Sequence, residues 1–151
     1  MAFPGSNAMA VAFDEARAAG ARGEVPIGAV IVDAAGSILG RAGNRTRERN
    51  DPTAHAEVLA IRAAGAVLGS ERLIDCDLYV TLEPCPMCAA AIGFARVRRL
   101  YYAAPDPKGG GVDHGPRIYA HPTCHHRPEV YGGIGEAEAA TLLRDFFRER
   151  R

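Results

Sequence analysis

The sequence predicts an α/β fold, a single domain over residues 1–151 in which helices cover the faces of a central sheet. The chain is 48% apolar over 151 residues, which is enough to bury a core of its own. Runs rich in Val, Ile, Leu and Tyr alternate along the chain with segments of helical periodicity, and neither an internal repeat nor a linker interrupts this alternation. Strands that alternate with helices are typical of an α/β sandwich.

The amino-terminal part of the chain is expected to form a helix and a hairpin. Residues 1–6 look like a loose tail, and apolar residues within 9–16 then follow a helical spacing that ends near Gly20. The segment VPIGAVIVDAAGSILGRAGN, residues 25–44, contains two runs rich in Ile, Val and Leu around a turn at 33–36. This pattern predicts a β-hairpin.

The rest of the chain alternates between helix and strand signals. The expected elements are a helix that starts at Asp51, Pro52 and Thr53 and stops near Gly69, a strand over 77–82, a helix over 87–95 and a strand over 98–104. Residues 109–135 are rich in Gly, Pro and His, and their pattern assigns no element. The final segment, EAEAATLLRDFFRERR over 136–151, has the pattern of an amphipathic helix.

Composition limits where the protein acts. Lys and Arg number 18, equal to Asp and Glu, so no net charge draws the chain toward nucleic acid or a membrane, and an RNA partner would have to meet a local basic patch. Asp14 and Glu15 stand where a signal peptide would need apolar residues. The longest apolar runs, such as 27–32, are far shorter than the ~20 residues that cross a bilayer. We therefore expect a cytoplasmic protein with no membrane partner.

The motif PCPMC places Cys85 and Cys88 at the start of a predicted helix. Residues three apart lie on the same side of a helix, so both sulfurs can face one point in front of it. The positive end of the helix also stabilises thiolates, which are the form of cysteine that binds zinc. A lone C-x-x-C pair leaves zinc, a thioredoxin-like redox site and coincidence open, although an upstream H-x-E motif is not part of the redox pattern.

The motif AHAE places His55 and Glu57 at the start of another predicted helix. If two parallel neighbouring strands deliver both helices to one edge of the sheet, His55, Cys85 and Cys88 converge as three metal ligands, and water takes the fourth tetrahedral position. Zinc lowers the pKa of water to about 7, and Glu57 is close enough to carry a proton to a leaving group. The four residues together predict a catalytic zinc site for hydrolytic attack on an electron-poor carbon.

Simpler interpretations of these residues exist. A histidine or an acidic residue in the first turn of a helix is common without any metal. A purely structural zinc site would result if Cys76 or Cys124 filled the fourth position, and Glu57 would then have no role. The presence of all four residues, each pair at a helix start, favours the catalytic interpretation.

H-x-E followed by P-C-x-x-C is the signature of the zinc nucleobase deaminases. From about Val11 to the C-terminus, the segments EVPIGAVIVD, GNRT, DPTAHAE, LYVTLEPCPMC, DPKGG and LLRDFFRERR stand in the order found in one family of that superfamily. The chain thus resembles the bacterial tRNA-specific adenosine deaminases. The resemblance implies a three-layer α/β/α sandwich of the cytidine deaminase-like type, with a central mixed sheet of about five strands.

The resemblance also implies a role for each residue of the predicted site. His55, Cys85 and Cys88 would hold one zinc ion per subunit, and Glu57 would act as base and then as acid. The reaction would be attack of a zinc-activated water at C6 of adenine with loss of ammonia, which gives inosine. Substrate-binding positions are expected at Asn44, Ala56, Glu83, Asp106 and Phe147.

Some of these substrate positions have structural alternatives. Asn44 could simply end a strand, and Asp106 could form a turn beside Pro107. In the DFFRERR segment, Phe147 is expected to stack near the anticodon loop and Phe146 to face the core. The alternative is a core helix with a solvated basic face.

Two features concern partners and departures from the family pattern. The family is a homodimer that acts on the tRNA anticodon loop, and the small-residue segment CAAAIGFA, residues 88–95, could pack at such an interface or on the sheet. His121, Cys124, His125 and His126 fall in a segment that the family varies, and they could suggest a second metal site, although no helical spacing fixes their positions. Pro105 stands where the family carries a basic residue.

Three functions compete at this point. The first is deamination of the wobble adenosine of tRNA, and the second is deamination of a small molecule such as guanine or cytosine with the same zinc chemistry. The third is a non-enzymatic zinc module that binds RNA, which would need a fourth protein ligand and would leave Glu57 without a role.

Overall fold

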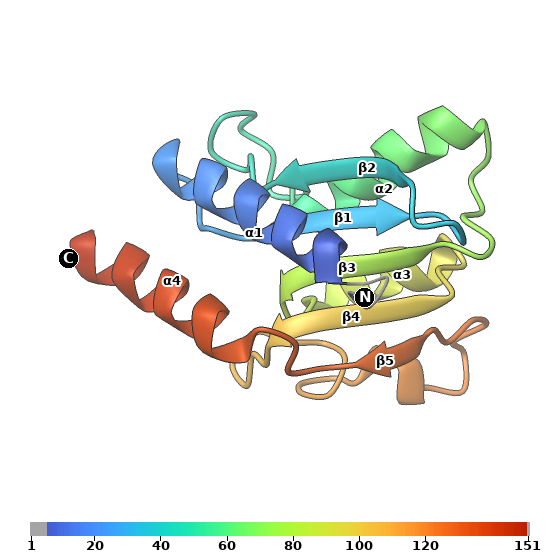
Figure 1. The fold of residues 1–151 in the computed structure, drawn as a ribbon. Coiled ribbons are helices and arrows are strands. Elements are labelled where there is room, and N and C mark those ends of the chain that lie inside the picture. Colours follow the sequence, from blue (N-terminus) through green and yellow to red (C-terminus); the bar gives the residue numbers. More distant parts are fainter. Residues whose placement is uncertain (1–5, 151) are drawn as a thin grey trace.

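The computed structural model describes residues 6–150 and has a five-stranded mixed sheet between two pairs of helices (Figure 1). Helices α1 (Ser6–Ala21) and α4 (Glu136–Glu149) lie on one face, and α2 (Ala56–Leu68) and α3 (Pro86–Phe94) lie on the other. The strands are β1 (Gly28–Val32), β2 (Ile38–Gly43), β3 (Asp77–Leu82), β4 (Arg99–Ala104) and β5 (Glu129–Tyr131). The predicted three-layer α/β/α sandwich is therefore confirmed.

The sheet order is β2-β1-β3-β4-β5. Strand β1 pairs antiparallel with both β2 and β3, whereas β3, β4 and β5 run parallel. We expected the two helices of the site to follow parallel neighbouring strands, and this was wrong in one respect. Strands β2 and β3 are parallel to each other, but β1 lies between them. Helices α2 and α3 still meet because both leave the same edge of the sheet and cover the same face (Figure 1).

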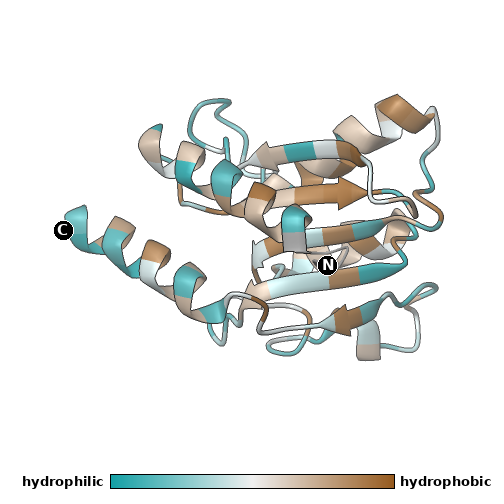
Figure 2. Cartoon of the chain, viewed as in Figure 1, coloured by the Kyte–Doolittle hydropathy of each residue, from teal (hydrophilic) through white to brown (hydrophobic). Residues whose placement is uncertain are grey.

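Successive side chains of β1 point to opposite faces of the sheet and pack into two separate hydrophobic cores. Ala29 and Ile31 face α2 and α3, whereas Val30 and Val32 face α1 and α4. Every residue of β1 is buried because the strand has a neighbour on each side and helices over each face. Figure 2 shows strand β1 as hydrophobic and α4 as alternating between polar and apolar residues, as the sequence predicted for an amphipathic helix.

Two helix starts differ from the expectations, and one helix end agrees with them. Helix α1 already begins at Ser6, and the rest of the expected tail, residues 1–5, lies outside the described residues. Helix α2 begins at Ala56 and not near Asp51, because the Asp51 carboxylate accepts hydrogen bonds from the Thr53 N–H (2.9 Å) and hydroxyl (2.7 Å) and so closes a separate turn. The end of α2 was predicted correctly, since Gly69 has the left-handed conformation with φ of 64°.

Strand β5 is an element that the sequence did not reveal. It has three residues and pairs in parallel with β4, and a 3-10 helix at Ile118–Ala120 precedes it. Stacked aromatic rings pack β5 against the neighbouring strands. Tyr131 stacks on Tyr101 (5.1 Å between centroids), and Tyr101 stacks on Tyr79 (4.4 Å). Among the described residues, no helix is both long enough and apolar enough to span a membrane.

Candidate active site

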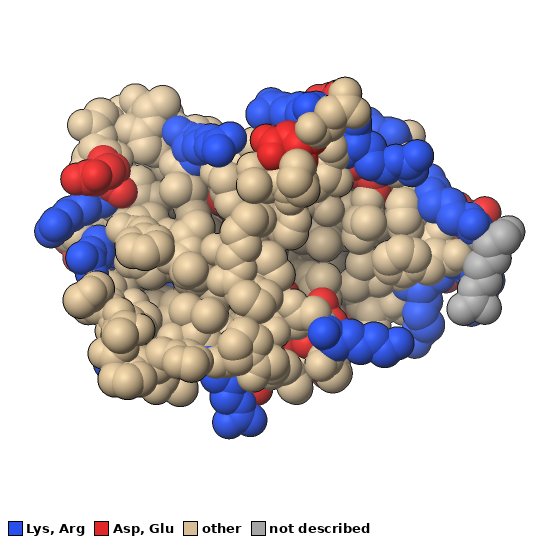
Figure 3. Space-filling view, turned by 180° about the vertical axis from the view of Figure 1, so that it is seen from behind, with Lys and Arg blue, Asp and Glu red and all other residues tan. Residues whose placement is uncertain are grey.

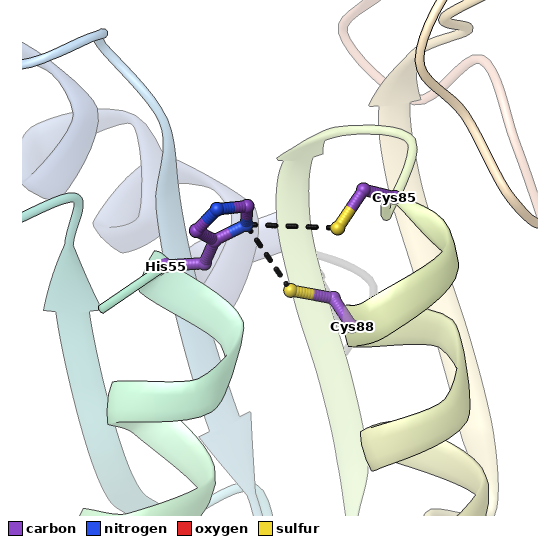
Figure 4. Close-up of side chains that lie close together, drawn as sticks. All are labelled: His55, Cys85 and Cys88. Atoms are coloured by element: carbon purple, nitrogen blue, oxygen red, sulfur yellow. Dashed lines mark hydrogen bonds between the residues drawn. The ribbon is translucent and has the colours of Figure 1, made fainter. Parts of the chain in front are cut away.

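Three side chains converge where α2 and α3 begin. His55 is the N-cap of α2 and Cys85 is the N-cap of α3, and neither side chain caps its own helix. Cys88 follows in the first turn of α3. His55 Nδ1 lies 3.6 Å from Cys85 Sγ and 3.5 Å from Cys88 Sγ, and Figure 4 shows the three groups pointing toward one another. The predicted convergence of these residues is present in the structure.

These distances fit a tetrahedral zinc ion. Zinc binds histidine nitrogen at about 2.0–2.1 Å and cysteine sulfur at about 2.3 Å, so tetrahedral angles place nitrogen and sulfur about 3.5 Å apart. Nδ1 and the two sulfurs all lie within 4.8 Å of one another. Two sulfurs and one imidazole are also the donors that zinc prefers.

The other two cysteines do not join this group among the residues that the structure describes. Cys76 lies just before β3, and its thiol contacts the Ile74 carbonyl oxygen at 3.6 Å. Cys124 donates to the His126 carbonyl oxygen at 3.2 Å. A fourth cysteine ligand from either position is therefore not available in this geometry, which disfavours a purely structural zinc site.

Protons in the group are distributed unequally. The pKa of Cys85 is lowered to about 4, mainly by the hydrogen bond from Cys88 and then by that from His55. The pKa of Cys88 is raised, because its thiol donates to Cys85 and is buried. The hydrogen bond to Cys85 also raises the pKa of His55. Binding of a metal by both sulfurs therefore requires loss of the Cys88 proton.

Glu57 lies in the first turn of α2, two residues after His55, and is only 4% exposed. Burial raises the pKa of its carboxyl to about 7, and the neighbouring Cys85 acts in the same direction while His55 opposes it. A carboxyl group with a pKa near neutrality can both accept and donate a proton under ordinary conditions. The environment of Glu57 thus suits an acid–base residue.

Asn44 directly follows β2 and reaches the start of α2. It is buried, and its Oδ1 accepts a hydrogen bond from the Ala56 N–H at 3.2 Å. This bond replaces the side-chain cap that His55 does not provide, and it leaves the His55 ring free to face the cysteines. The structure thus brings Asn44 and Ala56 to the site, with the Ala56 N–H already occupied.

Asp106 and Glu83, two further expected substrate positions, bind the protein's own backbone or are buried. Asp106 lies in the loop after β4, where its Oδ1 accepts hydrogen bonds from the N–H groups of Lys108 (3.2 Å) and Gly109 (2.9 Å). Asp106 therefore closes the turn beside Pro107 that was expected as the alternative to a substrate contact. The side chain of Glu83 has 0% exposure, so its carboxylate is not presented to a ligand.

The two C-terminal phenylalanines face different ways. Phe146 is 9% exposed and Phe147 is 53% exposed, which matches the expected orientation of both rings. The Arg150 guanidinium lies 3.7 Å from the centre of the Phe146 ring. Helix α4 covers the opposite face of the sheet from α2 and α3 and projects beyond the sheet (Figure 1). Phe147 is therefore not in contact with the His55 group in this chain.

Two buried acidic residues organise the loops beside the site, and the sequence did not reveal this role for either of them. Glu24 is buried, and its carboxylate accepts hydrogen bonds from the N–H groups of Arg47 (3.1 Å) and Glu48 (2.9 Å). Glu83 was expected to touch the substrate, but its carboxylate binds the backbone of the loop after β4. Acidic residues next to apolar runs were the available signal, but their partners are distant in sequence. Figure 3 views the molecule from the side of α2 and α3, and it shows Lys and Arg side chains above and below the hollowed part of that face.

A histidine and glutamate at one helix start, facing a C-x-x-C pair at another, define a zinc-dependent deaminase class of protein. Residues 5–104 match the family model for the cytidine and deoxycytidylate deaminase zinc-binding region. The tRNA-specific adenosine deaminase of Agrobacterium fabrum is 63% identical over 143 residues, which cover 95% of this chain and 93% of that protein. The chain belongs to the cytidine and deoxycytidylate deaminase family and, within it, to the tRNA-specific adenosine deaminases.

Two solved structures are similar over most of the chain. One comes from a study of A-to-I editing by tRNA:A34 deaminases at the wobble position of transfer RNA; it is 61% identical, covers 91% of this chain and 99% of its own, and has a TM-score of 0.89. The guanine deaminase of Nitrosomonas europaea is 25% identical, covers 97% of this chain and 85% of its own, and has a TM-score of 0.81. The guanine deaminase of Bacillus subtilis is 46% identical but covers only 66% of this chain and 63% of its own, with a TM-score of 0.63. The fold is thus shared with small-molecule deaminases, whereas the 63% identity over 95% of the chain is to a tRNA enzyme.

Proposed function

We propose that this protein hydrolytically deaminates adenosine to inosine at the wobble position of tRNA. The observation that carries this conclusion is the 63% identity to a tRNA-specific adenosine deaminase over 143 residues. That identity extends well beyond residues 5–104, the zinc-binding region of the wider family. The small-molecule alternative rests on guanine deaminases that are either 25% identical over 97% of this chain or 46% identical over only 66% of it.

The proposed chemistry centres on Glu57. Zinc, one ion per subunit held by His55, Cys85 and Cys88, would supply a water of pKa about 7 as the nucleophile. The Glu57 carboxylate accepts a proton from the attacking water and delivers it to N1 of adenine as oxygen bonds to C6. Glu57 then carries the second proton to the exocyclic nitrogen, the C6–N bond breaks, and ammonia leaves. Water and adenosine are consumed, and inosine and ammonia are formed.

Substrate contacts are assigned by the same proposal. Asn44 would hold the flipped base, since its Oδ1 is fixed by Ala56 and its amide NH₂ group can still donate. Asp106 would contact the sugar beside the target. We also place the protein in the cytoplasm, with the anticodon loop of tRNA as its partner. The Glu83 side chain is buried, so we do not propose that it touches the substrate.

The decisive experiment compares substrates. Purified, zinc-loaded protein is incubated with an anticodon stem-loop that carries adenosine at the wobble position, and in parallel with free adenine, guanine and cytosine. Inosine in the RNA, without turnover of the free bases, is the expected result. Turnover of guanine or cytosine without any inosine in the RNA would replace the proposal by the small-molecule alternative.

Substitution of Phe147 by alanine should weaken the use of RNA. The exposed ring can stack on a base, and such a contact is worth roughly 1–3 kcal/mol, so we expect kcat/KM for the stem-loop to fall about 10-fold with zinc content unchanged. Ile74→Ala is a suitable control, because Ile74 is 59% exposed and precedes β3 at the opposite end of that strand from the site. Equal kcat/KM values for Phe147→Ala and wild type would remove Phe147 from the RNA contact.

We also propose that the protein is a homodimer that uses the outer face of α3. Phe94 is 77% exposed at the end of this helix, beside an apolar groove of about 430 Å³ between α3 and residues 116–126. A large exposed aromatic side chain beside an apolar groove is typical of an interface between chains.

Phe94→Glu is therefore expected to convert the dimer to a monomer in sedimentation experiments. A buried glutamate would lose its hydration without gaining a partner. Val67→Glu is the matched control, since Val67 is 66% exposed on α2. A wild-type protein that sediments as a monomer would contradict the dimer directly.

A further inference from the structure

The Glu83 carboxylate binds the backbone of the loop of residues 106–114. Its Oε1 accepts a hydrogen bond from the Asp106 N–H (3.0 Å) and lies 2.7 Å from His114 Nδ1. Its Oε2 accepts hydrogen bonds from the N–H groups of Val112 (3.2 Å), Asp113 (2.9 Å) and His114 (3.1 Å). Five donors thus gather on one side chain that solvent does not reach. A buried carboxylate with so many donors is a strong and directional anchor.

The same loop packs on the turn that carries Cys85. The Gly111 N–H donates to the Pro84 carbonyl oxygen at 2.8 Å. A Cβ atom at Gly111 would lie 2.5 Å from the backbone nitrogen of Pro86, and one at Gly110 would lie 2.4 Å from Glu83 Oε2. Both glycines are therefore required by close approach. The loop therefore packs directly on residues 83–86, which include the candidate zinc ligand Cys85.

We infer that Glu83 is a positioning residue that fixes Asp106 for its contact with the substrate. This inference rests on the proposed function, in which Asp106 contacts the sugar beside the target adenosine. Glu83 binds the backbone of Asp106, while the Asp106 side chain closes its own turn through Lys108 and Gly109. Glu83 thus acts on RNA through Asp106, without touching RNA itself.

Glutamine at position 83 would release Asp106 selectively. A glutamine side chain has one acceptor oxygen and one NH₂ group, which cannot accept a hydrogen bond. The oxygen is expected to turn toward the three N–H groups of Val112, Asp113 and His114, because that choice satisfies the most donors. The NH₂ group then faces the Asp106 N–H and His114 Nδ1. The imidazole can accept from it in its other tautomer, but the Asp106 N–H loses its partner.

A double-mutant cycle tests this relation. Glu83→Gln should lower kcat/KM for the stem-loop about 10-fold, through KM more than kcat, as expected for the loss of one hydrogen bond to a charged group. Asp106→Ala should also lower it. In the Asp106→Ala background, Glu83→Gln should have almost no further effect, because residues that act through one contact are not additive. The same 10-fold loss in both backgrounds would overturn the inference.

Two controls separate positioning from loss of structure or metal. Zinc content should be unchanged in Glu83→Gln, and loss of zinc in proportion to activity would also overturn the inference. Glu71→Gln makes the same chemical change at an exposed position between α2 and β3, and should leave kcat/KM unchanged.

A second measurement needs no variant at position 83. The backbone amides of Asp106, Val112, Asp113 and His114 lie in a loop, yet all donate to a buried carboxylate. They should exchange hydrogen slowly in the zinc-loaded wild type, and the Asp106 amide should stay protected in Asp106→Asn. Rapid exchange of the Asp106 amide would contradict the inference. If wild type forms no inosine in RNA, the proposed function fails, whereas an additive cycle with active wild type fails only the role of Glu83.

Discussion

Glu57→Gln is expected to lower the rate of inosine formation by about 10²–10⁴-fold, the range for loss of a general acid–base residue. Glutamine keeps the volume of the buried side chain but cannot accept a proton from water. Glu57 is not one of the three groups that converge as ligands, so zinc content should equal that of wild type. Single-turnover measurements with saturating enzyme and the stem-loop substrate would report the chemical step directly.

The interpretation of Glu57→Gln depends on intact metal binding and folding. Zinc content and the melting temperature should be measured on the same preparations. Glu48→Gln is a suitable control, because Glu48 is an exposed residue of the loop before α2 that pairs with Arg45. A Glu57→Gln protein with full zinc and more than a small fraction of wild-type activity would show that another group moves the proton.

The zinc-binding motifs were readable in the sequence because they depend on local geometry. Cys85 and Cys88 lie one turn apart at the start of a helix, and the helix start was marked by Pro86 at N1. His55 required one long-range assumption, that α2 and α3 meet at one sheet edge. That assumption held even though β1 separates β2 from β3. Both strands run antiparallel to β1, so they end on the same side of the sheet, where α2 and α3 begin.

The loops around the site could not be predicted in the same way. The donors that bind Glu83 lie between 23 and 31 residues further along the chain, and no periodicity connects them to it. The resemblance suggested a substrate contact for Glu83, whereas the structure buries its carboxylate under residues 106–114. Strand β5 was missed for a related reason, since three residues carry too little pattern to signal a strand and stacking on Tyr101 positions it.

Removal of zinc should abolish activity and lower stability together. Without the metal, the pKa of water returns from about 7 to about 15.7, so activity should fall by several orders of magnitude after dialysis against a chelator and return when zinc is added. A metal that binds only the folded state also stabilises it, so the melting temperature should fall and recover in parallel. Activity that survives complete removal of zinc would contradict the assignment of His55, Cys85 and Cys88.

Cysteine substitutions locate this effect within the chain. Cys88→Ser should lose zinc and activity, because Cys88 Sγ lies 3.5 Å from His55 Nδ1 and serine offers a poor zinc ligand in place of a thiolate. Cys124→Ser is the matched control, since Cys124 is a free cysteine outside the group whose thiol donates to a carbonyl oxygen, a bond that a hydroxyl can also make. It should retain zinc and full activity. If both variants lost zinc equally, the metal would require the segment of residues 121–126 as well, and the three-ligand site with a position open to water would be wrong.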